Sequence, residues 1–93
     1  MIIVTVKSKT KPEFANQYIN EFKKVAIEVR AEKGCLEYEL YQCGVDQSEF
    51  FLFERWESKN ALDAHLQTNH MVDFLAKTGE WFDSKDINVY EAK

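Results

Sequence analysis

The alternation of two hydrophobic periods along the chain is the feature that most restricts how this sequence folds. Segments in which every second residue is apolar predict β-strands, and segments with an apolar residue at every third or fourth position predict amphipathic helices. Strand-like segments run over Ile2 to Lys9, Cys35 to Cys43, Phe50 to Glu57 and Ile87 to Tyr90, and helix-like segments begin near Pro12 and after Ser58. The predicted order of elements is therefore βαββαβ.

Local signals mark the ends of the two predicted helices. Pro12 suits the first turn of a helix because its missing N–H is not needed there, and Gly34 suits a left-handed cap at the other end. Ser58 is a good N-cap for the second helix. The segment Gln67-Thr68-Asn69 is a candidate for a break within that helix, since Thr and Asn prefer caps and turns to helix interiors.

The order βαββαβ is that of the ferredoxin-like α+β fold, in which an antiparallel four-stranded sheet carries both helices on one face. A chain of 93 residues is expected to form a single domain, which spans residues 1–93. The strands carry large apolar residues on both sides, for example Phe51 and Phe53 against Leu52 and Trp56. The face without helices therefore needs cover, and two chains stacked sheet to sheet would supply it. We expect a homodimer.

Composition excludes several classes of partner. The 12 basic and 16 acidic side chains give a net charge of −4 without a basic cluster, so nucleic-acid binding is not expected. The chain has no run of about 18 apolar residues and no leader-like start, so we expect a cytoplasmic protein with no membrane partner. Cys35 and Cys43 would lie about 26 Å apart in one strand, too far for a disulfide. Reduced thiols fit a reducing compartment.

Two neighbouring stretches resemble the signature of a known family. They are Phe53-Glu54-Arg55-Trp56-Glu57-Ser58 and Ala61-Leu62-Asp63-Ala64-His65-Leu66-Gln67-Thr68-Asn69-His70-Met71. Through them the chain resembles the antibiotic-biosynthesis monooxygenase superfamily, with its nearest likeness to the quinol monooxygenase branch. The likeness in pattern extends over nearly the whole chain, although only residues 53–71 are specific. The resemblance implies a homodimer that forms a dimeric α+β barrel, a pocket between each sheet and its own helices, and oxygenation of aromatic quinols or polyphenols without a cofactor.

Trp56 and Glu54 are candidate substrate-binding residues on one predicted strand. In the resembling family the matching tryptophan lines the substrate pocket, where a flat indole stacks against an aromatic ring; the alternative is a core tryptophan. Glu54 is a carboxylate in an apolar strand, so it either points into a cavity or has a partner such as Arg55 of a neighbouring chain. Tyr38 and Tyr90 are further candidates, each with a hydroxyl able to donate to an oxygenated ring, and half-buried packing is the alternative.

His65 is the candidate catalytic residue, a general base. It follows Leu62 by about one turn and should look toward the sheet, and an unperturbed histidine titrates near pH 6.5. The alternative is a structural histidine with its hydrogen bonds satisfied. His70 would lie about 140° further around a continuous helix, the wrong geometry for a two-histidine metal face. No bound metal is therefore expected, and His70 is predicted to cap or pack at the break.

The leading hypothesis is a small enzyme that uses dioxygen to oxidise an electron-rich aromatic such as a quinol or polyphenol, with no flavin, haem or metal. His65 would take a proton from a phenol or quinol hydroxyl, and the anion would then pass an electron to dioxygen.

Three alternatives stay open. Lys7 or Lys9 near the pocket would favour the isomerases of the same superfamily, which act on small phosphorylated signalling sugars. A haem-degrading branch relies on an asparagine in the first strand, and Ile2 to Lys9 has none. The third is a non-catalytic ligand-binding or stress-response dimer, for which a pocket without ionisable groups would be the distinguishing observation.

Overall fold

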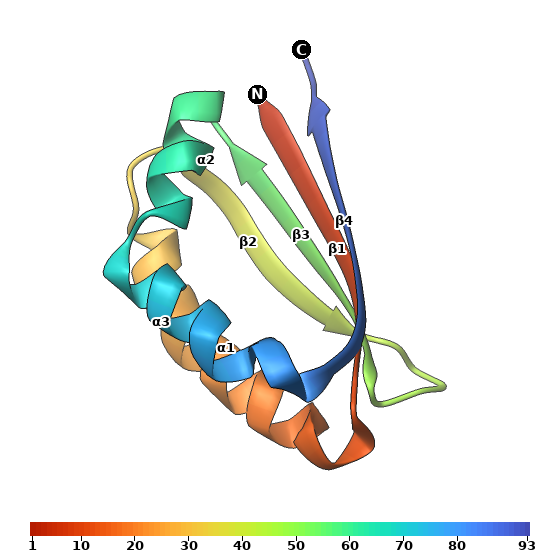
Figure 1. The fold of residues 1–93 in the computed structure, drawn as a ribbon. Coiled ribbons are helices and arrows are strands. Elements are labelled where there is room, and N and C mark those ends of the chain that lie inside the picture. Colours follow the sequence, from red (N-terminus) through yellow and green to blue (C-terminus); the bar gives the residue numbers. More distant parts are fainter.

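The computed structural model describes all of residues 1–93. Its elements, in chain order, are β1 (Ile2–Thr10), η1 (Pro12–Phe14), α1 (Ala15–Arg30), β2 (Cys35–Gln42), β3 (Glu49–Trp56), α2 (Lys59–Leu66), α3 (Asn69–Thr78), η2 (Gly79–Trp81) and β4 (Phe82–Glu91), where η marks a short 3-10 helix. The four strands form one antiparallel sheet in the order β2-β3-β1-β4, and the three α-helices lie together on one face of it (Figure 1). The predicted ferredoxin-like α+β fold is confirmed.

The inner face of the sheet, which the helices cover, carries the hydrophobic core. Paired residues in an antiparallel ladder share a face, so the pairs Ile2↔Trp56 and Val4↔Glu54 define one inward-facing set. The main buried cluster consists of Ile2, Val4, Phe22, Val25, Ala26, Val29, Tyr38, Leu52, Trp56, Leu62 and Met71. Full burial of each large apolar side chain contributes about 1.5–3 kcal/mol. The same cluster therefore stabilises the fold and encloses Glu54.

The outer face of the sheet has no cover within the chain. The pairs Ile3↔Tyr90 and Tyr41↔Phe51 put aromatic and apolar side chains there. Tyr41, Phe51 and Tyr90 are all exposed. The uncovered face that the sequence predicts is present, and its exposed aromatic side chains lie among charged ones such as Lys7 and Arg55.

The second predicted helical segment is two helices, because Thr68 interrupts it. The Thr68 hydroxyl accepts a hydrogen bond from the N–H of Met71 (3.3 Å), which caps α3. The same hydroxyl donates to the carbonyl of His65 (2.8 Å), near the end of α2. The predicted break is confirmed, and His70 consequently does not continue the helix that carries His65.

Gly34 lets the turn after α1 pack directly against α2. Its φ of +88° lies in the left-handed region that favours glycine, as the sequence predicts. A Cβ atom at this position would lie 2.5 Å from the Cβ of Ala61, in the first turn of α2. Ser58 caps that turn by accepting from the N–H of Ala61 (3.1 Å), and the N–H of Glu57 donates to the carbonyl of Gly34 (2.8 Å). These contacts hold the turn, and with it Glu32, beside α2.

The last strand, β4, lies at the edge of the sheet and packs mainly against β1. Ile87 and Val89 pair with Val6 and Val4, so they belong to the inner face. They are nevertheless 59% and 58% exposed. The inner face is therefore open along β4.

The two ends of the chain meet at one end of the sheet (Figure 1). The ammonium group of Met1 donates to the carbonyl of Ala92 (3.1 Å), and the N–H of Ala92 donates to the carbonyl of Met1 (2.8 Å). These bonds join the start of β1 to the end of β4.

Two findings bear on the other expectations from the sequence. Cys35 and Cys43 are both free thiols. None of the helices combines the length and the apolar character that crossing a membrane requires.

Candidate active site

Trp56 and Glu54 form a buried pair on the inner face of β3, where the strand period puts both side chains on the same side. The Nε1–H of Trp56 donates a 2.9 Å hydrogen bond to Oε1 of Glu54. Burial raises the pKa of Glu54 to about 7; the hydrogen bond from Trp56 opposes this shift, and the charge of Glu32 adds to it. Arg55 points to the other face, where its Nε donates to Glu37 (2.8 Å). Glu54 therefore exchanges its proton near neutral pH.

His65 lies against the Trp56 ring, with the ring centroids 4.5 Å apart and 36° between the planes. The ring of Tyr38 meets His65 edge-on at 5.8 Å. His65 is only 3% exposed, so the prediction that it looks toward the sheet is confirmed. Burial lowers the pKa of His65 below its ordinary value of 6.5, while the hydrogen bond and charge of Glu32 act in the opposite direction. At pH 7 the imidazole is therefore neutral and able to accept a proton.

Glu32 binds both histidines of the chain, a contact that the sequence did not reveal. Nδ1 of His65 lies 3.1 and 3.0 Å from its two carboxylate oxygens, and Nε2 of His70 lies 2.6 Å from Oε2. The prediction that His70 caps or packs at the break misses this contact. The expected separation of 140° between His65 and His70 assumed one continuous helix. Because the helix breaks at Thr68, that angle does not apply, and both side chains reach Glu32. The one feature of the sequence that could have pointed to Glu32 as a site residue is its position two residues before the expected cap at Gly34.

Tyr38 joins the cluster from β2. Its ring stacks on Phe22 with centroids 5.1 Å apart and 8° between the planes. Burial and, after it, the charge of Glu54 raise the pKa of Tyr38 well above its ordinary value, so its hydroxyl keeps its proton and can donate. The same two causes raise the pKa of Tyr18, on α1. The sequence did not single out Tyr18 as a site residue, because its spacing with Phe22 is that of an ordinary apolar stripe.

Tyr90 and the lysines of β1 lie on the opposite side of the sheet. Tyr90 is on the exposed outer face, so the sheet separates its hydroxyl from Trp56 in the same chain. Lys7 and Lys9 share that outer face through their pairs in β3. The structure thus brings together Glu54, Trp56, His65 and Tyr38, but not Tyr90. Neither Lys7 nor Lys9 lies near this cluster, as a site for a phosphorylated substrate would require.

The cluster is more closed than the sequence predicts. The family resemblance implies a pocket between the sheet and its helices that Trp56 lines, but the five main pockets of the chain are lined by other residues. Thr10 Oγ1 is the one fully buried side-chain oxygen or nitrogen without a hydrogen-bond partner. Nε2 of His65 and Oε2 of Glu54 have no hydrogen-bond partner within the chain, and both residues are buried.

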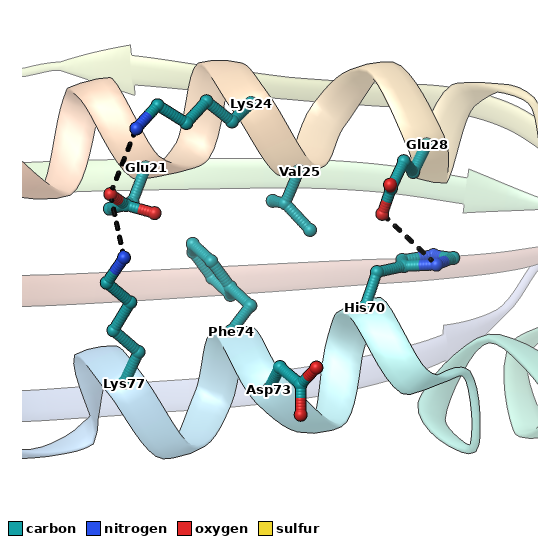
Figure 2. A pocket seen from close by; sticks show the side chains of 8 residues that line it. All are labelled: Glu21, Lys24, Val25, Glu28, His70, Asp73, Phe74 and Lys77. Atoms are coloured by element: carbon teal, nitrogen blue, oxygen red, sulfur yellow. Dashed lines mark hydrogen bonds and ion pairs between the residues drawn. The ribbon is translucent and has the colours of Figure 1, made fainter.

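A charged pocket of about 240 Å³ lies between α1 and α3 (Figure 2). It is lined by Glu21, Lys24, Val25, Glu28, His70, Asp73, Phe74 and Lys77. Lys24 and Lys77 both bind Glu21, at 3.4 and 3.1 Å. His70 connects this pocket to Glu32, and through Glu32 to the buried cluster. No group of three or more His, Cys, Asp and Glu side chains is arranged to hold a metal ion.

Comparisons with known proteins extend over most of the chain. Residues 1–77 match the family model described as Antibiotic biosynthesis monooxygenase. The chain is 30% identical over 80 residues to the Bacillus subtilis (strain 168) protein named "Putative monooxygenase YcnE", an alignment that covers 86% of this chain and 84% of YcnE.

Solved structures show the same likeness in three dimensions. A conserved protein from Methanosarcina mazei Go1 superposes with a TM-score of 0.92 at 29% identity, covering 99% of this chain and 92% of that one. Rv0793 from Mycobacterium tuberculosis superposes with a TM-score of 0.90 at 28% identity, covering 99% of this chain and 94% of that one.

Proposed function

This chain belongs to the antibiotic biosynthesis monooxygenase family, and we propose that it inserts an oxygen atom from dioxygen into an electron-rich aromatic ring, such as that of a quinol or polyphenol, without a flavin, haem or metal. The observation that carries the proposal is the buried cluster of Trp56, Glu54 and His65. The cluster combines a flat aromatic surface with two groups whose shifted pKa values suit proton exchange near neutral pH. Such a site suits a ring that carries a hydroxyl group.

The proposed reaction starts with a proton transfer. Nε2 of His65 takes the proton of the aromatic hydroxyl, and the resulting anion gives one electron to dioxygen. The two radicals combine at a ring carbon to form a peroxide, which regains the proton from His65. The peroxide then splits into a ring carbonyl and water, with loss of the hydrogen on that carbon. One oxygen atom enters the ring, the other leaves in water, and the substrate supplies all the electrons.

Three side chains position the substrate in this proposal. Trp56 offers its ring as a stacking surface. Glu54 in its protonated form and the hydroxyl of Tyr38 donate hydrogen bonds to the substrate oxygen, because both keep a proton that a surface carboxylate or an ionised phenol would lack. Burial raises the pKa of Glu54 and lowers that of His65. Glu54 is therefore assigned as the donor and His65 as the proton acceptor.

The open inner face along β4 is the proposed entrance. Ile87 and Val89 are exposed there although their register places them on the core side. An apolar ring that approaches along this strip removes apolar surface from water on its way to Trp56.

The proposed assembly is a homodimer in which two chains stack through the outer faces of their sheets to form a dimeric α+β barrel. The exposed aromatic side chains of Tyr41, Phe51 and Tyr90 on this face support it, because burying them against a second chain would remove apolar surface from water. Interfaces of stable homodimers often bury about 2,000 Å² or more in total. In this assembly Tyr90 belongs to the dimer interface.

Two observations favour oxygenation over its alternatives. A non-catalytic binding protein has no need of buried ionisable groups, whereas Glu54 and His65 are both buried beside Trp56. An isomerase for phosphorylated sugars needs cations near its site, whereas Lys7 and Lys9 lie on the other face of the sheet.

The test is oxygen uptake by chelator-treated protein with a panel of quinols and phenols, followed by mass spectrometry of the product formed under ¹⁸O₂. We expect uptake with at least one quinol and one labelled oxygen atom in its product. His65→Gln should lower the rate about 100-fold, and Lys7→Gln, on the outer face, should leave it unchanged. Isomerisation of a phosphorylated sugar without any oxygen uptake would overturn the proposal.

A further inference from the structure

We propose that Glu32 is the positioning residue for His65: its carboxylate accepts the hydrogen on Nδ1 and so fixes the tautomer whose unprotonated Nε2 acts as the base. The inference deepens the proposed function and rests on it for the role of His65 as base. Its structural part, the tautomer, stands on the contacts of Glu32 alone.

The contact between the two side chains assigns the hydrogen. Nδ1 of His65 lies 3.1 Å from Oε1 and 3.0 Å from Oε2 of Glu32. An ionised carboxylate can only accept hydrogen bonds, so Nδ1 is the donor. A neutral imidazole carries one hydrogen, which leaves Nε2 with its lone pair. Without this contact a neutral histidine is free to adopt the opposite tautomer, which cannot accept a proton at Nε2.

His70 keeps the Glu32 carboxylate in place. Its Nε2 lies 2.6 Å from Oε2 of Glu32, and its Nδ1 lies 3.4 Å from Oε2 of Glu28 (Figure 2 shows the contact with Glu28). A hydrogen on Nε2 of His70 donates to the Glu32 carboxylate. The backbone of Glu32 is also held, because its carbonyl accepts from the N–H of Cys35 (3.2 Å). The carboxylate is therefore fixed from the α3 side as well as by the turn that carries it.

The groups that face His65 come from every element packed around it. They are Glu32 in the turn after α1, Tyr38 on β2, Glu54 and Trp56 on β3, and His70 on α3. Glu32 is the one whose negative charge touches the imidazole ring directly. When Nε2 accepts a proton, the new charge on the ring lies against that carboxylate, which stabilises it in a site with little water. Glu32 thus acts through His65 and does not need to touch the substrate.

The experiment is ¹⁵N NMR of the histidine rings at about pH 8, where the neutral form is observed. The chain has two histidines, so a His70→Gln spectrum assigns both. In the unmodified protein we expect Nδ1 of His65 to carry the hydrogen. Glu32→Gln, whose amide can donate to Nδ1, should shift the population toward the Nε2–H tautomer and lower kcat for quinol oxidation by about 10²- to 10⁴-fold. Glu32→Asp keeps an acceptor and should restore the wild-type tautomer, with part of the rate.

Glu21→Gln is the matched control, because it makes the same change on α1 at a carboxylate that binds Lys24 and Lys77 and neither histidine. Its His65 spectrum and kcat should match wild type. An Nε2–H tautomer in the wild-type protein, or an unchanged tautomer in a folded Glu32→Gln variant, would overturn the inference. If no quinol is oxidised at all, the proposed function fails, and the NMR result still decides whether Glu32 sets the tautomer.

Discussion

The Nε1–H of Trp56 lies 2.9 Å from Oε1 of Glu54, and this bond holds a carboxyl group inside the core of the chain. One N–H does not replace the water that a carboxylate loses on burial, so the pKa of Glu54 rises to about 7 despite the bond. The stability of the fold should therefore depend on the ionisation of this residue.

Glu54→Gln should remove a pH dependence of the free energy of unfolding. The pKa of Glu54 is about 7 in the folded chain and near 4.5 in the unfolded chain, so its stabilising contribution is complete below pH 4.5 and is lost as the pH rises through 7. The loss is at most about 3 kcal/mol. Urea unfolding between pH 5 and 8 should show this fall in wild type and a flatter profile in Glu54→Gln, which keeps an acceptor for Trp56.

Glu57→Gln is the control for this measurement. Glu57 directly follows β3 and is exposed, so its variant should keep the wild-type pH trend. A Glu54→Gln variant with the same fall as wild type would show that the buried carboxyl is not its source.

Oxygen uptake with an active quinol should show a bell-shaped dependence on pH. His65 must be neutral to act as a base, and burial lowers its pKa, so the acid limb should lie below pH 6.5 and not at the unperturbed histidine value. The alkaline limb should lie near pH 7, where Glu54 loses the proton that it donates to the substrate oxygen.

Two variants assign the limbs of this profile. His65→Gln should lower kcat by about 100-fold or more and abolish the acid limb, while Glu54→Gln should abolish the alkaline limb. Thermal melting of the same samples checks that both variants are folded. An unchanged rate in folded His65→Gln would move the role of base to another group or to the ionisation of the substrate itself.

Much of the site could be predicted because it follows from local periods. Two residues on one strand with a spacing of two share a face, which places Glu54 beside Trp56, and helical phase points His65 at the same face. The order of elements likewise follows from where the period changes between two and about 3.6. These relationships require no knowledge of how distant segments pack.

The remaining features depend on contacts between distant segments. Glu32 meets His65 only because Gly34 packs on α2, and it meets His70 only because Thr68 breaks the helix. The register of β4 against β1 decides that Tyr90 lies on the outer face, and a strand of alternating residues does not reveal which of its sides is turned inward.

Gly34→Ala should destabilise the chain by about 2 kcal/mol or more, since the new Cβ meets both a left-handed backbone and the Cβ of Ala61. The separation of α2 from the turn should also weaken the contact between Glu32 and His65, which the ring ¹⁵N shifts would report. Gly44→Ala is the control, because a Cβ at Gly44 has nothing within 4 Å and should change stability by less than about 0.5 kcal/mol. Equal unfolding free energies for the two variants would contradict the close packing.

Phe53→Glu should convert the proposed dimer to monomers, because Phe53 lies on the outer face of the central strand pair and a buried, unpaired carboxylate is costly there. Sedimentation velocity at micromolar concentration measures the change. Ile27→Glu places the same charge on α1 at a side chain that is 73% exposed, and it should leave the assembly as in wild type. A wild-type protein that sediments as a monomer would refute the dimer.

The hydrogen bonds between Met1 and Ala92 hold the two ends of the chain side by side. The same arrangement of elements in space could therefore be encoded by a gene that starts at a different element. A short linker could join the two ends, and new ends could be opened between Gly44 and Val45, in the turn between β2 and β3, because β3 begins after this turn and Trp56 is its last residue. Such a circular permutant would begin with β3 and finish with β2, yet every residue of the buried cluster would keep its neighbours.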